Sequence, residues 1–241
     1  MALQFSTAEQ SSENNGVKVL IYGDSGMGKT MIAATAPSPV LISAESGLLS
    51  LKSANVARVF GASQADITYN MPVILVRNVD DLVEAHRWCA TSAEARAFQT
   101  VGLDSISEIA EVVLNNAKRQ VKDPRQAYGE LIEKMESLVR SFRDLPGKHV
   151  YMAAKMEPMK DELTGVVRFG PSMPGAKLGP KFPYFFDEVF RLAVNKDPQG
   201  NSYRYLQTQP DLQFVAKDRS GALATVERPH LSYVFGKILG A

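Results

Sequence analysis

Gly23-Asp24-Ser25-Gly26-Met27-Gly28-Lys29-Thr30 matches the phosphate-binding loop pattern G-x-x-x-x-G-K-[ST] at every specified position. An apolar run with strand character precedes it at residues 17–22, and a helix-forming run follows at residues 31–36. Because glycines let the backbone wrap closely around an anion, we expect the loop amides and the start of the helix to bind a phosphate. Lys29 would reach the β- and γ-phosphates, and the Thr30 hydroxyl would ligate Mg2+. The alternative is a glycine-rich turn without a ligand.

The composition is that of an ordinary globular chain. Of its 241 residues, 45% are hydrophobic and 22% are charged, which suits one α/β domain with a buried core. The net charge of +1 excludes a global basic field, so nucleic-acid binding would need a local patch. The single cysteine, Cys89, fits a reducing, cytoplasmic location. No apolar run approaches the roughly 20 residues that cross a bilayer, so no membrane partner is expected.

The hydrophobic pattern predicts strands that alternate with helices. Strands are expected at residues 39–43, 72–76, 98–105 and 149–154, and a later series at 189–194, 202–207 and 213–216. A helix is expected after the strand at 72–76, with Asn78 as its N-cap. A later helix is expected to bury a stripe of apolar residues that runs from Tyr128 to Phe142. This order predicts an α/β fold with a mostly parallel sheet flanked by helices and an antiparallel C-terminal extension. We expect a flexible tail at 1–16, a core at 17–228 and a C-terminal helix or tail at 229–241.

Two acidic residues follow predicted strands and are candidates for the chemistry. Asp104 ends the strand at 98–105, where it would hold Mg2+ through the metal's water shell, or else cap the next helix. Glu45 follows the strand at 39–43. If the two strands are neighbours, Glu45 would face the γ-phosphate and orient or deprotonate an attacking water. The alternative is a solvated loop glutamate.

These motifs together resemble the RecA-like branch of phosphate-loop ATPases. Ser43-Ala44-Glu45 is similar to the Asp-Ala-Glu segment whose glutamate is the catalytic base in that branch, with serine in place of the aspartate. Leu103-Asp104-Ser105 matches its hydrophobic strand that ends in Asp-Ser. The resemblance implies a RecA-like core, ATP hydrolysis with Mg2+, and a γ-phosphate sensor position at Lys155.

A late segment resembles the DnaB-type hexameric helicases. Lys217-Asp218-Arg219, with Gly221 after it, is similar to a Lys-x-Arg segment that reaches the nucleotide of a neighbouring subunit. The resemblance implies that Lys217 and Arg219 stabilise transition-state charge in trans, within a ring or filament that has nucleotide at its subunit interfaces. The alternative is a solvated charged turn.

The size and motif order are similar to the small phage single-strand annealing proteins of the Sak type. This resemblance implies a weak, DNA-stimulated ATPase in the bacterial host cytoplasm, with single-stranded DNA and a single-stranded-DNA-binding protein as partners. It places DNA against residues 119–125 and 156–181, with Phe169 and Phe182 available for stacking. The basic residues expected to bind DNA are Arg119, Lys122, Arg125, Lys160, Arg168, Lys177 and Lys181. The alternative is that both segments are ordinary mobile loops.

Other functions remain open from the sequence. A DnaB-like ring motor or helicase loader would share the phosphate loop, but the chain shows no primase or helicase-linker segment. A nucleotide-dependent switch could bind a protein and not DNA. A small-molecule kinase usually has an Arg-rich lid, and residues 156–181 contain little arginine.

Overall fold

The computed structural model describes residues 7, 15–45, 47–160, 164–175 and 177–240. The strands are β1 (Lys18–Gly23), β2 (Pro39–Ser43), β3 (Val73–Leu75), β4 (Thr100–Asp104), β5 (His149–Lys160), β6 (Val167–Pro171), β7 (Glu188–Lys196), β8 (Ser202–Gln207), β9 (Lys217–Asp218) and β10 (Val226–Glu227). The α-helices are α2 (Lys29–Ile32), α3 (Ser53–Phe60), α4 (Val79–Thr91), α5 (Ile106–Gln120), α6 (Pro124–Arg143), α7 (Leu178–Lys181) and α8 (Leu231–Leu239). Four 3-10 turns complete the set: η1 (Ala33–Thr35), η2 (Leu48–Leu51), η3 (Glu94–Ala97) and η4 (Phe182–Phe185).

The sheet is mostly parallel, as the sequence predicts. Its main path runs β10-β8-β7-β1-β5-β4-β2-β3, with β6 paired to β5 and β9 paired to β7. All strands from β7 to β3 along this path are parallel, whereas β8 and β10 add antiparallel strands at one side. The predicted α/β fold class, a mostly parallel sheet flanked by helices with an antiparallel C-terminal extension, is confirmed.

Helices cover both faces of the sheet, and β1 shows why. Its residues alternate between two hydrophobic clusters: Val19 and Ile21 face one, and Leu20 and Tyr22 face the other. The first cluster contains residues of α2, α3 and α8, and the second contains residues of α4, α5 and α6. A strand that is buried on both faces requires a continuous apolar run, which residues 17–22 provide.

Side-chain caps fix the starts of α4, α5 and α6, and His230 caps α8. Asn78 accepts a hydrogen bond from Asp81 N at 2.9 Å, which confirms the predicted N-cap of α4. Ser105 caps α5 by accepting from Glu108 N, so the alternative that Asp104 is the cap is wrong. Asp123 caps α6, with Pro124 in its first turn.

Several sequence predictions differ from the structure. Residues 48–60 show no clear pattern in the sequence but form η2 and α3. The expected strand at 213–216 is wrong, because only Phe214 forms an isolated bridge there and the pairing to β7 begins at Lys217. Tyr128, expected in the core stripe, is 39% exposed because it lies near the free end of α6.

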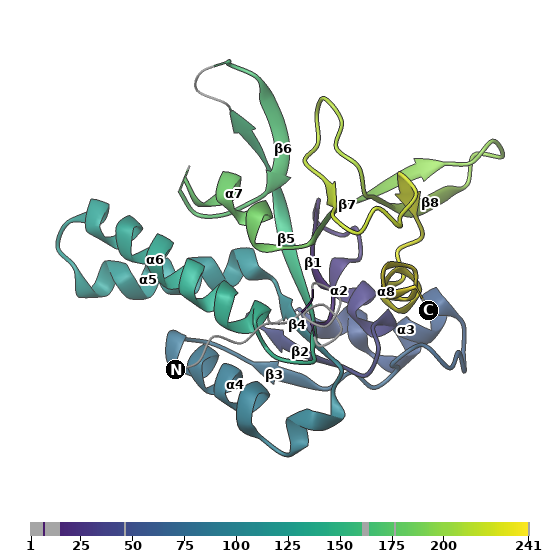
Figure 1. The fold of residues 1–241 in the computed structure, drawn as a ribbon, viewed down its shortest axis with the longest axis horizontal. Helices are drawn as coiled ribbons and strands as arrows, with labels where there is room; N and C mark the ends of the chain where they lie inside the picture. The colour runs from purple at the N-terminus through teal and green to yellow at the C-terminus, as the bar shows by residue number, and fades with distance from the viewer. Residues whose placement is uncertain (1–6, 8–14, 46, 161–163, 176, 241) are drawn as a thin grey trace.

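The longest departure is β5, which continues past the sheet. Its residues 156–160 pair with residues 167–171 of β6 to form a hairpin, so these two stretches are strands and not the loop expected from the sequence. Figure 1 shows this hairpin rising at the top, while α5 and α6 lie together at the left. In the described residues no helix combines the length and apolar character that spanning a membrane requires.

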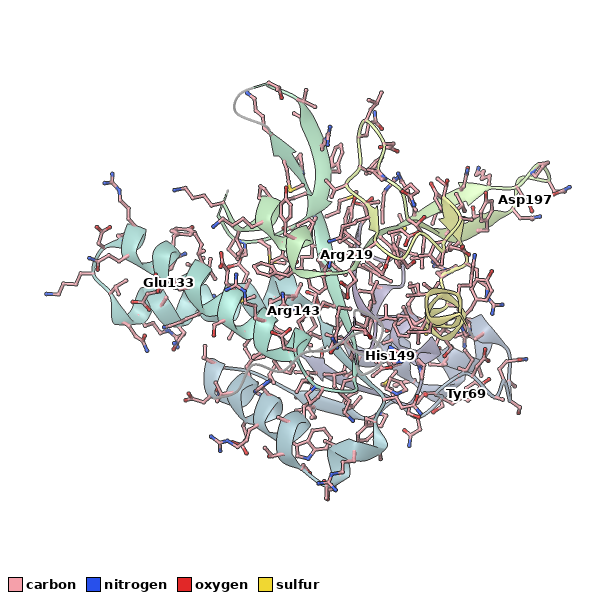
Figure 2. All side chains as sticks on the ribbon, viewed as in Figure 1. Tyr69, Glu133, Arg143, His149, Asp197 and Arg219 are labelled. Carbon is pink, nitrogen blue, oxygen red and sulfur yellow. The ribbon has the colours of Figure 1, made fainter. Side chains whose placement is uncertain are left out.

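The ends of the chain bear on the expected domain limits. The predicted tail at 1–16 lies almost entirely outside the described residues. Helix α8 is observed where residues 229–241 were expected to be a helix or tail. Its Leu231, Val234 and Phe235 are buried in the hydrophobic cluster that contains Val19 and Ile21. The predicted turn at 197–201 joins β7 to β8, and Figure 2 shows Asp197 at its tip. The domain limits themselves stay a prediction.

Candidate nucleotide-binding site

The glycine-rich loop lies at the carboxyl end of β1, between β1 and α2. Gly26 and Gly28 have φ values of 76° and 97°, which favour glycine and let the loop curve. Gly23 has no room for a side chain, because a Cβ there would lie 2.7 Å from the carbonyl oxygen of Leu192. Helix α2 is a single turn that continues as η1, so most anion-binding donors come from the loop and not from a long helix dipole.

The Lys29 ammonium lies within the loop. Its Nζ donates to the carbonyl oxygens of Gly23 and Asp24, both at 2.8 Å. Burial lowers the pKa of Lys29, while the carboxylates of Asp104 and Glu45 oppose this change. The fully buried Tyr151 on β5 donates to the Lys29 carbonyl at 2.7 Å, which anchors the end of the loop to the sheet.

Asp104 is a buried carboxylate with an unused oxygen. It is 2% exposed, and in the part of the chain that the structure describes its Oδ2 has no hydrogen-bond partner. Burial raises its pKa to about 6, although a hydrogen bond with Thr30 acts in the opposite direction. A buried, unpaired carboxylate is costly, and a cation would satisfy it. Asp104 and Thr30 therefore fit a Mg2+ site.

The metal would not have a protein cage. Among the described residues, no group of three or more His, Cys, Asp or Glu side chains is placed to hold a metal ion. Mg2+ keeps several waters and is commonly held by one or two protein groups together with substrate phosphates. The Thr30 and Asp104 pair suits that mode of binding.

Glu45 faces the loop across a cavity. Strands β2 and β4 are neighbours, with Ser43 opposite Asp104. The strands that precede Glu45 and contain Asp104 are therefore adjacent, which is the arrangement that a role for Glu45 requires. Ser105 Oγ donates to Glu45 Oε1 at 2.7 Å, and the Ser43 hydroxyl bonds with the Glu45 backbone. Residues of the loop, Glu45, Asp104 and Lys155 line a cavity of about 450 Å3.

Lys155 lies at the far side of this cavity, where β5 leaves the sheet. Its Nζ forms an ion pair with Glu108 Oε2 at 2.7 Å, and this hydrogen bond raises its pKa. Its backbone N–H donates to Ser107 Oγ at 3.0 Å. These contacts connect the middle of β5, where the strand leaves the main sheet, to the first turn of α5, which follows Asp104.

Lys217 and Arg219 do not belong to the loop of their own chain. Lys217 pairs with Val189, which is level with Leu20 in β1, below the end of the strand where the loop begins. The Lys217 ammonium donates to the carbonyl oxygens of Pro183 and Phe186. Arg219 forms an exposed ion pair with Asp187 at 2.9 Å. A role in trans stays a prediction.

The residues expected to bind DNA separate into four places. Lys160 and Arg168 lie on the β5–β6 hairpin and line a groove of about 810 Å3. Arg125 and Lys177 line a second cavity of about 450 Å3 between α6 and residues 174–178. The remaining three are Arg119 and Lys122, exposed at the α5–α6 turn, and Lys181, which pairs with Glu136 at 3.4 Å. The expectation that Phe182 stacks on bases is wrong, because it is fully buried.

We name the larger cavity the hairpin groove. Its charged lining residues, Lys160, Arg168 and Lys217, are all basic. Its other lining residues are Met159, Thr164, Val166, Pro180, Pro183, Tyr184, Val215 and Ala216. Tyr184 is 81% exposed and so offers a flat ring to a ligand. Phe169, the other aromatic expected to stack, lies half-buried against Phe214.

Sequence reasoning missed three supporting residues. The pattern Ser-x-x-Glu at residues 105–108 signals a helix start and would have identified Ser105 as the cap. Tyr151 shows no local signal of its bond to Lys29. Tyr22 directly precedes the loop, and its hydroxyl bonds with the carbonyl oxygens of Val215 at 2.7 Å and Phe169 at 3.1 Å. Tyr22 thereby joins the base of the hairpin groove to the strand that carries the loop.

Comparisons with known proteins identify a family and two solved structures with a similar fold. A family model described as an AAA domain matches residues 15–220. No curated protein matches the chain by sequence. A KaiC-like protein from the hyperthermophilic archaeon Pyrococcus horikoshii OT3 has a similar structure at 15% identity, with 80% of this chain and 77% of that chain covered and a TM-score of 0.43. The RadB recombinase is similar at 12% identity, with 89% and 91% covered and a TM-score of 0.49.

Proposed function

Because the chain belongs to the AAA-domain family, we propose that it is an ATPase that binds single-stranded DNA and promotes annealing or recombination. The annealing role, a phage origin and action in a bacterial cytoplasm follow the Sak-type resemblance of the sequence. The nucleotide site supports the ATPase part of the proposal. The hairpin groove supports the DNA part.

The loop residues would bind and orient ATP. The amides of residues 23–30 would surround the phosphates, and the Lys29 ammonium would exchange its two carbonyl acceptors for phosphate oxygens. Thr30 and Asp104 would hold Mg2+, which supplies charge neutralisation at the β- and γ-phosphates. The burial of Asp104 excludes water from this side of the site and strengthens its electrostatic interactions.

Glu45 is the group best placed to act on an attacking water. Ser105 donates to its Oε1, which leaves Oε2 to accept a proton from a water opposite the loop. The Ser43 hydroxyl fixes the backbone from which Glu45 projects. Lys155 would contact the same region, and its ion pair with Glu108 would respond to the charge of the γ-phosphate.

The observation that carries the proposal is the path of β5. Lys155 lines the nucleotide cavity and Lys160 lines the hairpin groove, and both lie on this one continuous strand. A rigid strand that contacts both sites can couple nucleotide state to ligand binding in the groove. Tyr22 gives a second connection, since its hydroxyl bonds with the carbonyl oxygen of Val215, which lines the groove, and with that of Phe169, which follows the lining residue Arg168.

The groove suits a single strand of nucleic acid. Phosphates require cations, and Lys160 and Arg168 extend from the two strands of the hairpin. Bases stack on exposed flat rings, and Tyr184 supplies one. The net charge of the whole chain is only +1, so this local concentration of basic residues is significant.

A homo-oligomer completes the proposal. Lys217 and Arg219 lie away from the loop of their own chain, so a contribution to hydrolysis requires a neighbouring subunit. In the assembly, Lys217 would have to leave the carbonyl oxygens of Pro183 and Phe186. Arg219 would have to leave Asp187.

The test is fluorescence polarisation with a labelled single-stranded oligonucleotide, with and without a non-hydrolysable ATP analogue. We compare wild type with Lys29→Ala, with Lys160→Ala/Arg168→Ala, and with the charge-matched control Arg119→Ala/Lys122→Ala. For single strands the salt slope changes by about 0.7 for each phosphate contact, so the groove variant should lose about 1.4. The control variant should keep the wild-type slope.

The outcomes separate the functions. Binding that requires the analogue, is lost in Lys29→Ala and is weakened by the groove variant supports the proposal. Nucleotide binding without DNA binding would refute the DNA part and favour the protein-binding switch. Equal losses in the groove and control variants would place the DNA elsewhere on the surface.

A further inference from the structure

The β7–β8 hairpin extends past the sheet edge that carries the phosphate-binding loop. Strand β7 pairs in parallel with β1, and the start of the loop at Gly23 lies against the Leu192 carbonyl. Arg204 on β8 is opposite Val194, two residues farther along β7. At about 3.3 Å per residue, Arg204 therefore lies roughly 7 Å beyond the level at which the loop begins.

The Arg204 side chain points to the loop. Residues two apart on a strand share a face, so Arg204 is on the same face as Leu206. Leu206 is fully buried in the cluster that contains Ile32 and Ala33, directly after the loop. A Cβ placed on Gly28 would lie 3.6 Å from Arg204 Nε and 4.0 Å from its Cδ. The guanidinium is thus next to the backbone of the phosphate-binding loop.

This guanidinium has no partner among the residues that the structure describes. Arg204 is exposed, and its side chain takes part in no hydrogen bond, ion pair or ring contact there. Two arginines, one on β7 and one directly after β9, which pairs with β7, are different: Arg191 lies 3.3 Å from the ring centre of Phe214, and Arg219 is paired with Asp187. An unpaired guanidinium beside an anion-binding loop has its donors available for phosphate oxygens, which it can bind in a bidentate manner.

The position of Arg204 also indicates which phosphates it would reach. In the sheet order, β8 and β7 lie on one side of β1, and β5, β4 and β2 lie on the other. Asp104, Glu45 and Lys155, which line the cavity beside the loop and would face the γ-phosphate, all come from that other side. Arg204 approaches the loop from the opposite flank, at Gly28.

We infer that Arg204 is a nucleotide-binding residue, which contacts the α- and β-phosphates held in the loop of its own chain. The inference rests on the proposed function, because it requires a nucleotide in the loop. It assigns to the β7–β8 hairpin a part in nucleotide affinity, and it makes Arg204 distinct from a γ-phosphate finger supplied by a neighbouring subunit.

The test is direct binding of fluorescent ADP and of a fluorescent non-hydrolysable ATP analogue. The variants are Arg204→Ala, Arg204→Lys and the control Tyr203→Ala, which removes an exposed side chain from the opposite face of the same strand. A hydrogen bond to a charged group contributes enough that its loss should weaken binding roughly tenfold to hundredfold. Thermal melting without nucleotide checks that all variants fold.

We expect Arg204→Ala to weaken ADP and the ATP analogue by similar factors, Arg204→Lys to recover part of the affinity, and Tyr203→Ala to match wild type. Unchanged affinity of Arg204→Ala for both nucleotides would overturn the inference while leaving the ATPase proposal intact. A loss confined to the ATP analogue would overturn the assignment to the α- and β-phosphates. A wild-type protein that binds neither nucleotide would overturn both proposals.

Discussion

Asp104→Asn should make the nucleotide-free protein more stable while it removes the response to Mg2+. The wild-type carboxylate is 2% exposed, and its Oδ2 has no partner among the described residues. Its folded-state pKa of about 6 lies above the ordinary value of 3.8. Stability is therefore lost as the pH rises through about 6, because ionisation is harder in the folded state. An amide of the same shape does not titrate and avoids this cost.

The magnitude follows from the pKa. A rise from 3.8 to about 6 is close to two pH units, each equivalent to about 1.36 kcal/mol, and relaxation around the site reduces the gain to roughly 1–3 kcal/mol. In a chain of this length, 1 kcal/mol moves the melting temperature by about 2–4 °C. We therefore expect Asp104→Asn to melt roughly 2–12 °C above wild type at pH 7.5 in EDTA.

The assay is thermal unfolding in EDTA and then with Mg2+ and a non-hydrolysable ATP analogue. Wild type should gain stability from Mg2+ beyond the gain from nucleotide alone, and Asp104→Asn should not. Asp24→Asn, an exposed carboxylate in the same loop, removes the same charge and should leave the metal-free melting temperature unchanged. The reasoning is refuted if Asp104→Asn is less stable than wild type in EDTA, or if it keeps the full response to Mg2+.

Three further predictions concern other carboxylates and one histidine. Burial and the neighbouring Asp218 raise the pKa of Glu188 from 4.5 to about 7. Stability should therefore fall as the pH rises from about 4.5 to 7, and Glu188→Gln should flatten this dependence in urea titrations. Equal pH dependences in the two proteins would contradict the prediction. Burial lowers the pKa of His149, whose Nδ1 accepts from Val17 N at 3.0 Å, to about 4. Stability should therefore fall by roughly 1–3 kcal/mol as the pH drops from about 6.5 to 4, and His149→Gln should not show this loss. Glu45→Gln should slow phosphate release by roughly a hundredfold or more with nucleotide affinity retained, and unchanged turnover would exclude Glu45 as the base.

Local sequence was sufficient for features that depend on a few neighbouring residues. The loop at 23–30 is recognisable because glycine, lysine and threonine must stand at fixed spacings to surround a phosphate. The N-cap at Asn78 and the strand at 202–207 were also predicted correctly, since caps and alternation are short-range signals. The helix at 53–60 was missed, because it has only eight residues and Val56 is its one buried side chain, so its apolar pattern is short.

The candidate DNA site shows the opposite case. Lys160, Arg168 and Lys217 come from three separate strands, and only the folded chain brings them to one groove. The sequence placed Arg119 and Lys122 in the same set, but they lie at the α5–α6 turn and do not line the groove. The sequence contains no indication of a role for Arg204, because its position next to Gly28 depends on the register of β8 against β7.

By itself, the sequence determined that this protein has a phosphate-binding loop on a mostly parallel α/β core, with carboxylates at strand ends. The tertiary structure decided which side chains meet: Glu45 with Ser105, Asp104 with Thr30, and Arg204 with Gly28. The physical reason is the range of the interactions. Glycine conformations, caps and strand alternation act over a few residues, whereas strand order and register are fixed by burial of the two hydrophobic clusters across the whole chain.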